Sequence, residues 1–254
     1  MERKQFFRTM GLAGLALTSV KILQACSTED DSVSSGSNAG SGSISSGGNS
    51  STTTDSCTVS PSETAGPFPT KNPSSLVATN IVSDRTGVPL TITITVKNVN
   101  NSCAVLTDAI VDIWHCDKDG YYSEYGGTQM QSVNYTTVHF LRGRQTTNAN
   151  GKVQFTSIFP GWYSGRATHI HVHIYNSSGT SLLITQIGFP EGDNSAVVQV
   201  NAASEYGYTK GMTGYTYNAS DNIFSDDTTG SEIATLSGSV ADGFSLEHTI
   251  YVSA

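Results

Sequence analysis

The run Leu90-Thr-Ile-Thr-Ile-Thr-Val96 alternates apolar and hydroxyl side chains without a break. On a β-strand, such alternation places the aliphatic groups on one face and the threonines on the other, as in a sheet that is buried on one side. Similar β-branched runs recur between turns rich in Gly, Asn, Asp and Ser, at residues 109–114, 138–141, 153–158, 168–175, 182–187 and 248–252. This spacing predicts an all-β fold, an antiparallel β-sandwich with long loops and little helix.

Helix and turn signals are sparse. Residues 195–206 are the best helix candidate and could equally form a loop. Residues 148–151 (Asn-Ala-Asn-Gly) predict a turn between two strands, with Gly151 able to adopt a positive φ.

The N-terminal segment resembles an export signal. Basic residues precede a short apolar run at residues 10–20, and Leu23-Gln-Ala-Cys26 resembles the lipobox of bacterial lipoproteins. We therefore expect residues 1–26 to be the signal, with lipid attached to Cys26. The Arg3-Lys4 pair is also similar to a relaxed twin-arginine signal. Residues 27–56, rich in Ser and Gly, predict a flexible tether to a folded domain at residues 57–254. The expected location is the cell envelope of a bacterium, with membrane contact only through the anchor.

Composition and cysteine count narrow the possibilities further. The chain has 254 residues, a net charge of −8 and only 13% charged residues, which argues against a coiled coil and against nucleic acid as a partner.

An exported domain permits a disulfide among Cys57, Cys103 and Cys116. Turn-like surroundings favour Cys57 with Cys103, but the other pairings stay open.

The chemistry-bearing segment is His169-Ile-His-Val-His173. On a strand its three imidazoles share one face, and neighbouring histidines lie about 7 Å apart at Cα, so two of them can bind one metal ion. A polar strand face with hydrogen-bonded histidines is the alternative interpretation.

Five motifs surround this segment in the order found in one enzyme family. They are Ser60-Pro-Ser-Glu-Thr-Ala-Gly-Pro-Phe68, Val111-Asp-Ile-Trp-His-Cys-Asp-Lys-Asp-Gly-Tyr-Tyr-Ser123, Phe140-Leu-Arg-Gly-Arg-Gln145, Pro160-Gly-Trp-Tyr163 and Arg166-Ala-Thr-His-Ile-His171. Together they resemble the intradiol ring-cleavage dioxygenases of the catechol and protocatechuate type, over most of residues 57–254.

The resemblance implies a metal centre. Its ligands fall on Tyr122, Tyr163, His169 and His171, with one Fe(III) per chain, and Tyr121 is then a neighbour of the ligand. Phenolate is a hard anionic donor that suits the ferric ion, and two phenolates with one hydroxide cancel its charge. A neutral centre of this kind can be buried at low cost.

The resemblance also assigns the surroundings of the metal. Arg166 would stabilise negative charge on the substrate and Gln186 would orient the oxygen species. Gly66, Pro67 and Phe68 would line the ring pocket, with Trp162 either a pocket wall or core filler.

Other conspicuous polar residues receive structural interpretations. His115, His139, His173 and His248 are expected to be hydrogen-bonded structural groups. Arg142 and Arg144 could anchor the site loop, but pairing with acids such as Glu124 is the safer expectation.

The implied reaction joins an aromatic diol and O2, with cleavage between the two hydroxyl-bearing carbons to give a muconate-type diacid. Tyr163 is expected to leave the metal and accept a substrate proton. The loops at residues 124–137 and 189–222 would shape the pocket, while the ring substituents and the oligomeric state stay open.

Two other functions remain in competition. The sandwich also resembles transthyretin-like and immunoglobulin-like modules, so a surface lipoprotein that only captures ligands is one alternative. A His/His/carboxylate Fe(II) oxygenase is the other. It is disfavoured because the segment His169–His173 contains no carboxylate, and the first one downstream is Glu191.

Overall fold

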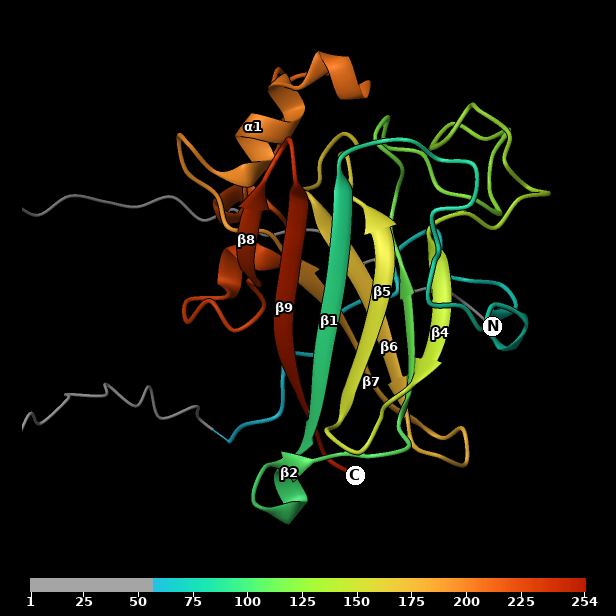
Figure 1. The fold of residues 1–254 in the computed structure, drawn as a ribbon, viewed down its shortest axis with the longest axis vertical. Coiled ribbons are helices and arrows are strands. Elements are labelled where there is room, and N and C mark those ends of the chain that lie inside the picture. Colours follow the sequence, from blue (N-terminus) through green and yellow to red (C-terminus); the bar gives the residue numbers. More distant parts are fainter. Residues whose placement is uncertain (1–56) are drawn as a thin grey trace, which may run out of the picture. The chain divides into compact units, whose positions relative to one another are not determined.

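A computed structural model describes residues 57–254 of the chain (Figure 1). The predicted export signal, Cys26 and the tether lie outside the described residues. Within the described part, no helix is long and apolar enough to cross a membrane.

Within residues 57–254 the strands form two sheets (Figure 1). One sheet has the order β2-β1-β9-β8, with β5 also paired to β1, and the other has the order β4-β3-β6-β7. The strands are β1 (Pro89–Asn98), β2 (Ala104–Val105), β3 (Ile110–Trp114), β4 (Arg142–Thr146), β5 (Lys152–Ile158), β6 (His169–Tyr175), β7 (Ser181–Gly188), β8 (Thr235–Ser239) and β9 (Gly243–Val252). The predicted β-sandwich is confirmed.

One strand pairing departs from the antiparallel pattern. β1 and β9 run parallel, with Ile92 opposite Leu246 and Val96 opposite Ile250. Parallel neighbours need a long connection in place of a hairpin, and here the chain forms the whole second sheet between them.

The main core lies between the two sheets and follows the predicted alternation. The apolar residues of β1, β3, β6 and β9 that face inward are almost completely buried and belong to one cluster. They include Ile92, Ile94, Val111, Ile113, Ile170, Val172, Ile174, Leu246 and Ile250. The opposite face of β6 therefore carries the histidines, as the pattern indicates.

Two strand predictions need correction. Residues 138–141 are not a strand: Leu141 has φ +55°, a left-handed backbone that interrupts pairing, and β4 begins at the next residue. β8 was not predicted, because its sequence Thr-Leu-Ser-Gly-Ser is short and polar. It pairs along the edge of β9.

The helix candidate at residues 195–206 resolves into two short elements. Ser195 caps α1 (Ala196–Ala202) by accepting a hydrogen bond from Val198 N, and a 3₁₀ turn, η3 (Ser204–Tyr206), follows. The predicted turn ends at Gly151 with φ +67°.

A disulfide joins Cys57 to Cys103, and Cys116 is a free, buried thiol. The favoured pairing is confirmed. It ties the beginning of the described chain to the turn after η2 (Val99–Asn101), close to the end of β1.

Candidate active site

Four side chains form a row across the outer face of the β4-β3-β6-β7 sheet. Arg142, Trp114, His171 and Gln186 occupy directly paired positions on the four strands. The Trp114 and His171 rings stack with their centroids 5.0 Å apart and 4° between their planes. The site therefore begins as a rigid strand surface on which His171 has a fixed ring orientation.

Two loops bring the tyrosines to this surface. One follows β3 and ends in Tyr122, and the other follows β5 and carries Tyr163. The loops press backbone against backbone: a Cβ on Gly120 would collide with the Trp162 carbonyl, and one on Gly161 with the Lys118 carbonyl. Only glycine allows so close an approach, which explains the glycines in both motifs.

Two of the predicted ligand atoms lie within contact distance of a third, His169 Nε2. His169 Nε2 is 3.1 Å from His171 Nε2 and 3.2 Å from Tyr122 Oη. The Tyr163 ring lies edge-on to Tyr122 and to His169, with centroids 5.8 and 5.7 Å away. All four side chains therefore gather at one point, the outer face of the second sheet. The site is thus not inside the sandwich.

The protonation states leave lone pairs directed at this point. His169 Nδ1 lies 2.6 Å from the Ala167 carbonyl, so Nδ1 carries the proton and Nε2 is an acceptor. Burial lowers the pKa of His169 to about 3 and that of His171 well below its ordinary value. Two neutral imidazole nitrogens 3.1 Å apart need a proton or a cation between them.

The donor set fits a hard metal ion. Two nitrogens that each bind one ion at about 2.1 Å lie no more than about 4.2 Å apart, so the 3.1 Å between His169 Nε2 and His171 Nε2 allows both to bind the same ion. Burial raises the phenol pKa of Tyr122 and of Tyr163, so only a strong cation would hold both as phenolates. Within residues 57–254 there is no group of three or more His, Cys, Asp or Glu able to hold a metal, so nothing in this part of the chain supports the His/His/carboxylate alternative.

Arg166 lies beside the ligand cluster and is almost fully buried. Its Nη2 donates to Gln186 Oε1 at 2.6 Å, and its Nε donates to Asp221 Oδ2 at 2.8 Å. Its Nη1 is 3.5 Å from both Tyr163 Oη and His169 Nε2. The positively charged guanidinium therefore faces the ligand cluster with its Nη1 atom.

The predicted loop covers the site from the other side. A Cβ on Gly66, which has φ +69°, would come within 2.9 Å of His171 Cε1. Phe68 stacks on Tyr122 with centroids 4.9 Å apart and lies edge-on to Tyr163 at 6.4 Å. Gln186 Nε2 donates to the Thr64 carbonyl and so fastens the loop to β7. Pro67 lies between Gly66 and Phe68 but is itself exposed.

Arg142 anchors this loop and also lies within ion-pair distance of Glu124, so both interpretations of this arginine hold. It donates from Nη1 to the Phe68 carbonyl and to Thr70 Oγ1, and from Nη2 to the Ser123 carbonyl. Glu124 lies farther away, at 3.7 Å. Arg144 does pair with an acid, the buried Asp112.

The comparisons with known proteins agree with this arrangement. A family model described as "Dioxygenase" matches residues 68–226. A solved intradiol ring-cleavage dioxygenase from Tetranychus urticae is 30% identical, with a TM-score of 0.67 over 78% of this chain and 95% of that one. The chain belongs to the intradiol ring-cleavage dioxygenase family.

Two further relatives define the limits of the match. The dioxygenase domain of a Streptomyces sp. SirexAA-E fusion protein has a TM-score of 0.54 and 24% identity, over 78% of this chain and 99% of that one. That similarity concerns the fold. A chlorocatechol 1,2-dioxygenase of Rhodococcus opacus is 33% identical, but the match spans 35% of this chain and 38% of that protein.

Several conspicuous residues lie outside the dioxygenase site. Trp162 belongs to the main core, where its Nε1 donates to the Gly211 carbonyl, so the core-filler interpretation holds. His115 lies between the Cys116 carbonyl and Ser157 Oγ, and His173 contacts Ser181 Oγ. His139 bonds Glu124 Oε1.

Two residues of this dioxygenase site escaped sequence reasoning. Gln131 is buried and clamps the Tyr122 backbone: its Oε1 accepts from Tyr122 N at 2.7 Å and its Nε2 donates to Tyr122 O at 2.8 Å. Asp221 is completely buried against Arg166. Both come from loops without periodicity, and neither belongs to a motif quoted above.

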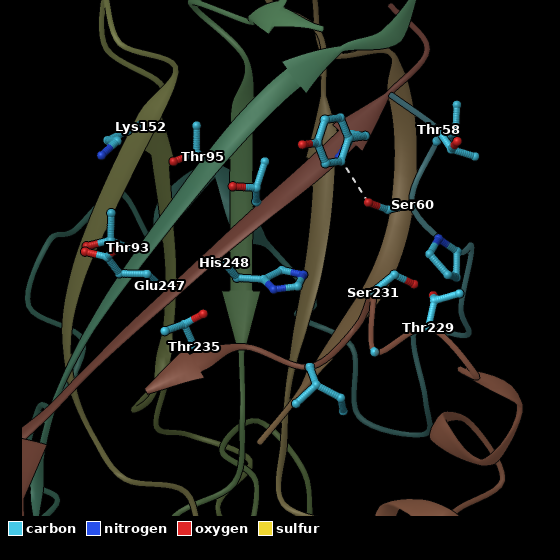
Figure 2. A pocket seen from close by; sticks show the side chains of 16 residues that line it. Thr58, Ser60, Thr93, Thr95, Lys152, Thr229, Ser231, Thr235, Glu247 and His248 are labelled. Carbon is cyan, nitrogen blue, oxygen red and sulfur yellow. Dashed lines mark hydrogen bonds between the residues drawn. The ribbon is translucent and has the colours of Figure 1, made fainter. Parts of the chain in front are cut away.

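A large groove in the described part of the dioxygenase lies elsewhere. It has a volume of about 690 Å³ and is bounded by the β1-β9-β8 face and by residues 58–61 and 229–233 (Figure 2). Its lining is rich in Thr and Ser hydroxyls and also includes His248. It contains none of the predicted site residues, so its size does not identify the catalytic centre.

Proposed function

We propose that this protein is a ferric intradiol dioxygenase that cleaves a catechol-type ring between its two hydroxyl-bearing carbons with O2, giving a muconate-type diacid. The observation that carries the proposal is the meeting of His169 Nε2, His171 Nε2 and Tyr122 Oη within 3.2 Å of their neighbours, with Tyr163 alongside. Two phenolates and two neutral imidazoles suit one Fe(III) per chain.

Tyr122, Tyr163, His169 and His171 would hold the iron, and iron chelated by both oxygens of a diol would supply the electron-rich ring that reacts with O2. Binding of the diol would release two protons. Tyr163 Oη is suited to accept one of them, and the hydroxide of the charge-neutral centre would accept the other. Tyr163 is only partly buried, whereas Tyr122 is completely buried and held at its backbone by Gln131. Tyr163 is therefore the ligand that can move away, and Tyr122 the one that stays.

The remaining residues bind and orient. Arg166 Nη1 would stabilise negative charge on substrate oxygens, since a fixed, buried cation needs no reorganisation. Gln186 accepts a hydrogen bond from Arg166 and donates one to the Thr64 carbonyl, so it links the arginine to the loop that carries Thr64. Gln186 would also help to orient the oxygen species. Phe68 and the Gly66–Pro67 backbone would form the wall against the ring and exclude water.

Colour and oxygen uptake test the proposal. The purified protein with one iron per chain should be red to brown from tyrosinate-to-Fe(III) charge transfer, and a catechol added without O2 should shift the band. Oxygen uptake should follow with at least one of catechol, chlorocatechol, protocatechuate and hydroxyquinol. A colourless, fully iron-loaded protein would refute the tyrosinate site. Band shifts without uptake would support the ligand-binding module instead.

We expect the clamp of Gln131 on Tyr122 to matter for metal affinity. Gln131→Ala removes both hydrogen bonds to the Tyr122 backbone and should weaken iron binding by about 10- to 100-fold, the usual effect of losing a residue that orients a ligand. Competition with a chelator measures this affinity. Gln199→Ala is the matched control, because Gln199 donates to a backbone carbonyl on the exposed side of α1. Equal affinities in the two variants would contradict the clamp.

We also propose that the protein is exported and anchored through a lipid on Cys26. The support is the sequence pattern of residues 1–26 alone. Mass spectrometry of the protein from membranes of a bacterial host should find a diacylglyceryl modification on Cys26, and Cys26→Ser should abolish it. An intact N-terminus on the wild-type protein would disprove the anchor.

A further inference from the structure

Asp221 is the only carboxylate within residues 57–254 that forms an ion pair with Arg166. Its Oδ2 accepts from Arg166 Nε at 2.8 Å and from Ala167 N at 2.7 Å. Its Oδ1 accepts from Ile223 N at 2.8 Å. With no exposed surface and its acceptor sites filled, this carboxylate is a built part of the interior.

Each nitrogen of the Arg166 guanidinium contacts a different partner. Nε is bound by Asp221 and Nη2 by Gln186, which fixes the plane of the guanidinium at two points. Nη1 is left to face Tyr163 Oη and His169 Nε2. Without Asp221, the group would keep one short hydrogen bond, at Nη2, and the two 3.5 Å contacts of Nη1, so it could rotate about the Nη2 bond.

Asp221 also belongs to a different part of the chain. It lies between two 3₁₀ turns, η4 (Asn218–Ser220) and η5 (Phe224–Asp226), in the loop region that follows α1. Its side chain is where this loop meets the segment that leads into β6. The loop thereby sets the position of a cation more than 50 residues earlier in the sequence.

We infer that Asp221 is a positioning residue that fixes the Arg166 guanidinium so that Nη1 points at the metal ligands and at the substrate oxygens. The inference rests on the proposed function. It assigns Asp221 no contact with substrate; Asp221 acts through Arg166. Its negative charge also balances the arginine, so that the pair adds no net charge beside the metal centre.

Asp221→Asn tests the inference, because the amide keeps the shape but has no charge and only one acceptor oxygen. If that oxygen faces Arg166 Nε and Ala167 N, the amide NH2 faces the donor Ile223 N, and the reverse orientation turns the NH2 toward Arg166. We expect kcat to fall by about 10- to 100-fold, since an error of about 1 Å in a catalytic group has effects of this order, with a change in KM below about threefold. Iron content should stay at the wild-type level. The anaerobic catechol band should shift, because Nη1 moves relative to Tyr163 Oη.

A double-mutant cycle separates positioning from general damage. In an Arg166→Gln background, adding Asp221→Asn should change kcat by less than about twofold, because residues that act through one another are not additive. This pair also leaves no unpaired buried charge, so it remains informative if Asp221→Asn alone fails to fold. Asp227→Asn is the matched control: Asp227 lies in the same region and accepts from Ser231 N and Glu232 N.

Each outcome decides one question. An unchanged kcat in Asp221→Asn, or an equal further loss in the Arg166→Gln background, would overturn the positioning role. The same loss in Asp227→Asn would assign the effect to loop damage and overturn it as well. A wild-type protein that shows no ring cleavage would defeat the proposed function, whereas an active wild type with an equally active Asp221→Asn defeats only this inference.

Discussion

Tyr122→Phe is expected to abolish the charge-transfer colour contributed by this ligand and to lower kcat/KM by more than about 100-fold, because losing even a hydrogen-bond partner of a metal ligand costs about 10- to 100-fold. The substitution removes one oxygen atom from a completely buried ring that stacks on Phe68. The fold should therefore persist. Iron content, the visible spectrum and oxygen uptake measure the result.

Tyr121→Phe is the matched control for this change. Tyr121 is the adjacent residue in the same loop, and its ring lies edge-on to Tyr135, which is not one of the four ligand side chains. We expect wild-type colour and activity from it. If Tyr121→Phe loses the colour while Tyr122→Phe keeps it, the ligand assignment is wrong by one residue.

Arg142→Ala is expected to cause the largest loss of stability. Truncation leaves the Phe68 and Ser123 carbonyls without their donor and opens a void under the ring-pocket loop. Removing one partner of a buried, hydrogen-bonded charged group costs about 3–5 kcal/mol, and in a domain of this size each kcal/mol lowers Tm by about 2–4 °C. Calorimetry should therefore show a decrease in Tm of about 10 °C.

Two companions isolate the cause. Arg142→Lys keeps the positive charge but not the planar set of five donors, so an intermediate loss is expected. Lys152→Ala removes an exposed cation from the other sheet and should alter stability by less than about 0.5 kcal/mol. A Tm for Arg142→Ala within about 2 °C of the wild-type value would show that the loop does not depend on this arginine.

Local pattern carried most of the fold prediction. The alternation in β1 and β6 placed the aliphatic side chains in the core and the histidines opposite, and burial agrees at Ile92, Ile170 and Val172. The strand predicted at residues 138–141 was wrong because apolar stretches also occur in loops. Leu141 is buried but has a left-handed backbone, which the periodicity of the sequence does not reveal. β8 was missed because its residues are mostly polar. It lies at the edge of its sheet, so its sequence lacks the apolar alternation of a buried strand.

The candidate site was predictable in part. Family motifs pointed to Tyr122, Tyr163, His169 and His171, and the structure brings these side chains together. Trp162 stayed undecided in the sequence, because a tryptophan beside a ligand can face either the pocket or the core. Its burial within the main cluster places it in the core.

The sequence by itself determined which side chains share a strand face, because the two-residue period of a strand is a local property. It also carried the motifs that identify the family. Only the tertiary structure decided that β9 runs parallel to β1, that Arg142 anchors the pocket loop and that Asp221 fixes Arg166. Each of these contacts joins residues far apart in the chain, and the packing of whole loops and sheets sets such contacts. No local pattern of residues encodes them.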